Sequence, residues 1–183
     1  KIEKNILDSK NIVFIKCDRK NLIELKKKLK NIKFDVVFDN CAYSLADVKN
    51  LLKNLNKNVV YIFSSTVMSY LNLYLKKKLK ENDWHDSRST NRMNLMYQNH
   101  ELIYAKNKRS IENFLIRNKK IKYIILRIHN VIGIDDFSKK TSMLFNSRLE
   151  QVEKLSIKKN DYLQFVYDQD LIKIITKIMS KNL

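Results

Sequence analysis

The spacing of the apolar residues, which changes repeatedly along the chain, constrains the fold more than any other feature. Short runs rich in β-branched and aromatic residues alternate with stretches whose apolar residues recur every three or four positions. We therefore expect four strands, at Asn11 to Asp18, Phe34 to Asp39, Asn58 to Ser64 and Lys122 to Arg127. We expect helices between them, at Asn21 to Lys30, Leu45 to Leu55 and Glu101 to Arg117. The segment from Ser65 to Trp84 fits neither pattern clearly.

Strands that alternate with helices in this way imply right-handed crossovers and a parallel sheet. The expected strands are apolar on both faces, which is typical of strands buried inside such a sheet. Beyond Gly133 we expect a helix at Thr141 to Lys154, a short strand at Leu163 to Tyr167 and a last helix at Leu171 to Ser180. The sequence thus predicts an α/β protein with a parallel sheet, and the strong strand signal is lost after Gly133.

Composition narrows the class of protein further. The 183 residues are 44% hydrophobic, which provides a core and excludes a disordered chain, and a single glycine excludes collagen. The two cysteines, Cys17 and Cys41, form no CxxC motif, so we expect neither a disulfide framework nor a zinc site, and a reducing cytoplasm fits them. The three histidines are too scattered to suggest a metal site. No apolar run has the roughly 20 residues needed to cross a bilayer, and no signal peptide is visible.

The net charge of +18 ordinarily suggests a nucleic acid or an anionic membrane as partner. The chain is also rich in asparagine and isoleucine, with one glycine and no proline. Lysine, asparagine and isoleucine have A/T-rich codons, whereas glycine and proline have G/C-rich ones. A genome biased towards A/T is therefore the other explanation for the positive charge. We expect the run from Lys76 to Lys80 to be a solvated face.

Polar side chains follow the expected strands, at the positions where ligands bind in parallel α/β sheets. They are Asp18 and Arg19, the segment Asn40 to Tyr43, the segment Ser64 to Thr66, and the segment Ile128 to Asn130. Any one of them could instead serve as an ordinary helix cap or turn residue.

Tyr104 and Lys108 lie four residues apart on an expected helix and so share one face. An ammonium beside a phenol favours the phenolate and lowers the phenol pKa towards the range useful for proton transfer. Tyr74 and Lys78 have the same spacing, but they lie in the lysine-rich tract. Tyr104 begins a helix on which Glu112 continues the same face and which leads into a buried strand, so we favour the Tyr104 pair.

Several segments resemble the extended short-chain dehydrogenase/reductases, also called the NAD-dependent epimerase/dehydratase family. They follow one another along the chain in the same order as in that family. Tyr104 to Glu112 matches the YxxxKxxxE motif, and Leu126 to Gly133 is similar to LRPxNVYG. Tyr61 to Tyr70 resembles the strand whose serine and threonine exit supplies a catalytic hydroxyl. The remaining matches are Phe14 to Arg19, Phe34 to Tyr43 and Leu163 to Leu171. The resemblance implies a partial Rossmann-like, doubly wound parallel sheet in residues 1–133 and part of a small substrate-binding region in residues 134–183.

The resemblance also implies roles for individual residues. Tyr104 would be the general acid and base, Lys108 would tune its pKa and hold the nicotinamide ribose, and Thr66 would bond the substrate oxygen. The cofactor, NAD or NADP, would further contact the strand-exit residues Asp18, Arg19, Cys41, Ala42, Ser64, Ile128, His129 and Asn130. The substrate would be a small molecule of the nucleotide-activated sugar class, in a cytoplasmic enzyme that could form a homodimer.

The chain departs from the family pattern in one important respect. The glycine-rich turn that cradles the pyrophosphate is absent, because Gly133 is the only glycine. If the resemblance holds, this chain is an internal part of a longer enzyme, and we expect it to be inactive alone. The competing hypothesis is an RNA-binding or catalytically decayed member of the same fold, favoured by the charge and opposed by the retained Thr66, Tyr104 and Lys108.

Overall fold

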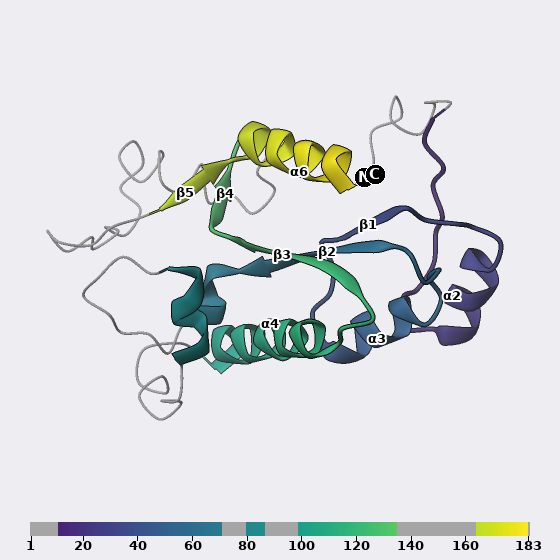
Figure 1. Cartoon of the computed structure of the whole chain (residues 1–183), viewed down its shortest axis with the longest axis horizontal. Coiled ribbons are helices and arrows are strands. Elements are labelled where there is room, and N and C mark those ends of the chain that lie inside the picture. The colour runs from purple at the N-terminus through teal and green to yellow at the C-terminus, as the bar shows by residue number, and fades with distance from the viewer. Residues whose placement is uncertain (1–10, 71–79, 87–98, 135–163, 183) are drawn as a thin grey trace, which may run out of the picture.

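The computed structural model describes residues 11–70, 80–86, 99–134 and 164–182. In this part of the chain, three parallel strands form the main sheet in the order β1-β2-β3 (Figure 1). They are β1 (Val36–Asp39), β2 (Val60–Thr66) and β3 (Lys122–Ile128). Val60 of β2 pairs with Val36 on one side and with Lys122 on the other, which makes β2 the central strand. Every residue of β2 is buried, and its first four residues are apolar, as expected for a strand inside a parallel sheet.

Helices α2 (Leu22–Leu29) and α3 (Leu45–Leu52) begin at polar caps. The side chain of Asn21 accepts a hydrogen bond from the backbone N–H of Glu24. Ser44 and Asp47 form a capping box, in which each side chain bonds the backbone of the other. These caps satisfy backbone groups that the first helical turn leaves without partners, so local sequence fixes where both helices start.

The long helix α4 (Asn99–Arg117) lies with α3 on one side of the main sheet (Figure 1). The core forms where these helices meet β2, around the fully buried side chains of Val48, Tyr61, Phe63, Ile111 and Leu115. Burial of each large apolar side chain contributes about 1.5–3 kcal/mol to stability. This packing fixes one face of α4 against the carboxyl half of β2.

A second, two-stranded parallel sheet follows β3 and consists of β4 (Asn130–Ile132) and β5 (Phe165–Tyr167). Helix α6 (Asp168–Asn182) continues directly from β5, and Figure 1 shows it on the side of the main sheet opposite α4. A Cβ at Gly133 would lie 1.9 Å from a carboxylate oxygen of Asp168, so a larger residue here would require the Asp168 side chain to move.

The structure corrects two expectations from the sequence. Asn11 to Asp18 is not a strand, because no described strand pairs with it, and Val13 is 82% exposed. The short strand β4, by contrast, was not expected, since three residues give no periodic pattern.

The ambiguous segment after β2 contains two 3₁₀ helices, at Val67–Tyr70 and Glu81–Asp86. The expected helix at Thr141 to Lys154 and most of the lysine run from Lys76 to Lys80 lie outside the described residues.

Candidate active site

The candidate site forms at the carboxyl end of the central strand. Ser64, Ser65 and Thr66 end β2 and are all buried, although each carries a hydroxyl group. Helix α4 packs beside them and presents Tyr104 and Lys108 from successive turns. The Nζ of Lys108 donates a 2.7 Å hydrogen bond to the backbone oxygen of Ser64. The expected catalytic residues of strand and helix therefore meet in one place.

Lys108 is a buried cation, with only 2% of its surface exposed. Its Nζ lies 4.8 Å from the ring centre of Phe63, 5.4 Å from that of Tyr43 and 5.6 Å from that of Tyr104. Burial lowers the pKa of Lys108, and the nearby Asp39 and Cys41 oppose this shift. In the described part of the chain, Nζ makes one hydrogen bond and no ion pair, so two of its three N–H groups remain available to a ligand.

Tyr104 is half-buried, and its ring lies 6.2 Å from that of Tyr43. Burial raises the pKa of Tyr104, Tyr43 adds to the rise, and a hydrogen bond with Thr66 opposes it. The pKa of Tyr104 is therefore raised, whereas its spacing from Lys108 predicted that this pKa would be lowered. The reason is that desolvation of the phenol dominates while the Lys108 ammonium bonds the Ser64 carbonyl. In this state the phenol keeps its proton at neutral pH.

Glu112 organises the wall of the site and is fully buried. One carboxylate oxygen accepts a very short hydrogen bond from the hydroxyl of Ser65. The other accepts bonds of 2.9 and 2.8 Å from the Nε and Nη2 of Arg127 in β3. Arg127 also donates to the Tyr70 hydroxyl at 2.9 Å. One buried ion pair thus ties α4 to the ends of β2 and β3, a role the sequence indicated only by placing Glu112 on the Lys108 face.

Asp39, the last residue of β1, is the centre of a second buried cluster. Its carboxylate accepts bonds of 2.9 and 2.7 Å from Arg19, one of 2.6 Å from the Tyr61 hydroxyl and one of 3.1 Å from the backbone N–H of Cys41. Burial raises the pKa of Asp39, but the bonds from Arg19 and Tyr61 outweigh it and hold this pKa below its usual range. Sequence reasoning missed Asp39. Its position at the end of an expected strand was the feature of the sequence that could have marked Asp39 as a candidate site residue.

The remaining predicted site residues lie around these two clusters. Arg19 is half-buried, and its guanidinium is already paired with Asp39. Asp18 is exposed and accepts a 2.9 Å bond from the backbone of Lys20. Cys41 is exposed, whereas Ala42 is fully buried.

The exit of β3 lies beside that of β2, because Ile128 pairs with Thr66. Next comes His129, which is partly buried, and burial lowers its pKa. Asn130 is exposed and begins β4. The register therefore brings the predicted Ile128 next to Thr66, with His129 and Asn130 following along the chain.

The described residues contain no group of three or more His, Cys, Asp or Glu side chains that could hold a metal ion. None of the helices described is both long and apolar enough to cross a membrane.

Solved structures similar to this chain include an epimerase and a dehydratase, although no family model and no curated protein sequence matches it. The ADP-L-glycero-D-manno-heptose-6-epimerase of Helicobacter pylori matches with a TM-score of 0.58 and 18% identity, over 91% of this chain and 56% of that one. The dTDP-glucose 4,6-dehydratase of Bacillus anthracis, solved in complex with NAD, matches with a TM-score of 0.68 and 17% identity, over 98% and 58%. This chain thus spans a little over half the length of these two proteins. It has the α/β fold, with parallel strands, of this epimerase and this dehydratase.

Proposed function

We propose that this chain forms the catalytic part of an NAD(P)-dependent epimerase, dehydratase or reductase that acts on a nucleotide-activated sugar. The observation that supports this most directly is the meeting of Thr66, Tyr104 and Lys108 at the carboxyl end of β2. The fold shared with an epimerase, and with a dehydratase solved with NAD, supports the same reaction class.

The residues present fit the nicotinamide half of the cofactor. A bound nicotinamide would supply hydride exchange with the substrate carbon. The two free N–H groups of Lys108 would donate to the ribose hydroxyls, and its charge suits an electron-rich partner. No glycine-rich turn is present to approach the pyrophosphate, so this chain provides one part of the dinucleotide site.

Tyr104 would move the proton. Because burial keeps its phenol protonated, Tyr104 begins as an acid that can donate to a developing oxyanion on the substrate. Thr66 bonds the same phenol and would orient it towards the substrate oxygen. Lys108, 5.6 Å from the ring centre, would favour the phenolate that remains after the transfer.

Substitution of Tyr104 by Phe in the complete gene product tests this role, because it removes only the hydroxyl. We expect turnover to fall by about 10²–10⁴-fold, the usual contribution of a positioned acid or base. Cofactor affinity, measured by isothermal titration calorimetry, should stay within about twofold, since Lys108 remains.

Tyr74→Phe is the matched control, because Tyr74 and Lys78 repeat the spacing of Tyr104 and Lys108. This variant should keep its turnover. Unchanged turnover in Tyr104→Phe, or an equal loss in both variants, would refute the assignment.

A further inference from the structure

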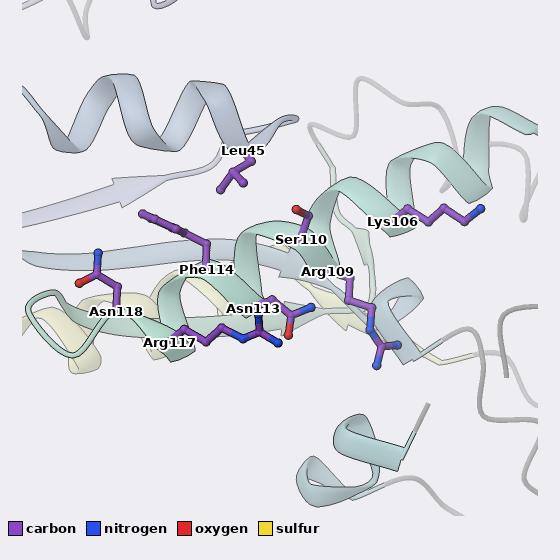
Figure 2. A pocket seen from close by; sticks show the side chains of 8 residues that line it. All are labelled: Leu45, Lys106, Arg109, Ser110, Asn113, Phe114, Arg117 and Asn118. Atoms are coloured by element: carbon purple, nitrogen blue, oxygen red, sulfur yellow. The ribbon is translucent and has the colours of Figure 1, made fainter. Parts of the chain in front are cut away.

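A groove of about 670 Å³ lies between α4 and the start of α3 (Figure 2). We call it the α4 groove. Its lining consists of Leu45, Lys106, Arg109, Ser110, Asn113, Phe114, Arg117 and Asn118. Lys106, Ser110, Asn113 and Arg117 recur every three or four residues, so they share one face of the helix. The buried Lys108 and Glu112 occupy another face of α4.

The lining is positively charged. Lys106, Arg109 and Arg117 provide three cations, and none of the eight lining residues is acidic. Lys49 of α3 adds a fourth cation, 5.4 Å from the ring centre of the lining residue Phe114. A row of like charges without a carboxylate is unfavourable by itself and favours an anionic occupant.

Arg109 is held in place by neutral groups. Its guanidinium donates to the backbone oxygens of Ser69 and Trp84, at 3.0 and 2.9 Å, and lies 4.8 Å from the Trp84 ring centre. These contacts orient the guanidinium, and the buried carboxylate of Glu112 also attracts it. A genome that favours lysine codons explains many lysines across the chain, but it does not explain an arginine held in this orientation at a groove whose eight lining residues include no carboxylate.

The shape and chemistry of the groove suit an extended strand better than a single ion. From Lys106 to Arg117 the helix rises by about 16 Å, at 1.5 Å per residue, so the cations form a row. Ser110, Asn113 and Asn118 add hydrogen-bond donors along that row, and Phe114 adds an aromatic ring. Basic grooves with polar and aromatic side chains bind single strands of nucleic acid through the backbone and the bases. We propose that the α4 groove binds single-stranded RNA, mainly through its phosphates.

Fluorescence anisotropy with a labelled twelve-nucleotide oligouridylate and the whole 183-residue chain tests this proposal. The groove variant is Lys106→Glu with Arg117→Glu, and the control is Lys177→Glu with Lys181→Glu on α6. All four side chains are exposed, and both double variants lower the net charge of +18 by the same amount. Far-UV circular dichroism should show that both fold.

We expect the dissociation constant of the groove variant to rise at least about tenfold, and that of the control to change less than about threefold. The slope of log affinity against log salt should fall by about 1.4 in the groove variant, since each phosphate contact on a single strand contributes about 0.7. Tyr104→Phe should bind RNA as the unmodified chain does, which separates this site from the candidate active site.

Two results would overturn the proposal. One is no binding at near-physiological salt, and the other is equal weakening in both double variants, which would assign binding to diffuse charge. Light scattering provides a further check, because a dimer that only the groove variant dissociates would instead assign the groove to contact between copies of this chain.

Discussion

The Arg127 to Glu112 ion pair gives the sharpest prediction about stability. The side chain of Arg127 is 9% exposed and that of Glu112 is not exposed at all, and two N–H groups of Arg127 bond the same carboxylate oxygen. Removal of one partner from such a buried pair leaves an uncompensated charge and typically costs about 3–5 kcal/mol. Arg127→Met, which keeps much of the volume, should therefore lower the free energy of unfolding by about that amount.

The same guanidinium provides its own control. Arg127 also pairs with Glu81 at 2.5 Å, but the side chain of Glu81 is 84% exposed. Water screens that pair, so Glu81→Gln should cost less than about 1 kcal/mol. Arg127→Lys keeps the charge but loses the two-point bond, and we expect an intermediate loss.

Urea unfolding followed by far-UV circular dichroism measures these differences. Fluorescence of Trp84, the only tryptophan, gives a second probe, since the Arg127 guanidinium lies 5.1 Å from its ring centre. If Arg127→Met is unfolded without urea, the ranking of Arg127→Lys below Glu81→Gln still tests the argument. Equal stability of Arg127→Met and Glu81→Gln would refute it.

Three further predictions concern other parts of the fold. Gly133→Ala should cost about 1–3 kcal/mol and speed amide hydrogen exchange in the first turn of α6, because the new Cβ would displace the Asp168 carboxylate, whereas unchanged exchange would contradict the close packing. Asn21→Ala should lower the unfolding free energy by about 1 kcal/mol in thermal melts, with Asn21→Ser retaining most of it, since the cap on Glu24 is lost only in the first. Burial lowers the pKa of Lys108 below 10.5, so the folded chain binds fewer protons than the unfolded chain between the two values, and this residue makes stability rise with pH there. Stability measured as the pH rises towards 10.5 should therefore increase more in the unmodified chain than in Lys108→Met, and identical slopes would count against the buried charge.

The apolar pattern predicted the main sheet and its helices well. Strands β2 and β3 and helix α4 lie within a few residues of their expected ranges, because a buried strand needs a continuous apolar run and a packed helix needs a spaced one. Asn11 to Asp18 shows the limit of the method. Its residues favour a strand, yet a strand also requires a neighbour for its backbone groups, which a local pattern does not supply.

The candidate site was predictable where sheet geometry determines it. Parallel strands place their carboxyl ends at one edge, which brought Thr66 near Tyr104 and Lys108 as expected. The Asp39 to Arg19 pair was not predictable, because among so many charged residues spacing does not select one partner twenty positions away. The direction of the Tyr104 pKa shift was missed because desolvation depends on packing that the sequence does not state.

The order of strands in the main sheet also means that β2 is synthesised well before β3, its partner on one edge. Val60 of β2 pairs with Lys122 of β3, whose position is translated 62 residues later. At about 5–20 residues per second, the ribosome needs roughly 3–12 s to make that stretch. Through this interval β2, with the most buried sequence in the described chain, has β1 on one edge and an open edge on the other. The newborn protein is thus most vulnerable to aggregation between the emergence of β2 and that of β3, and this is the interval in which a chaperone would protect it most.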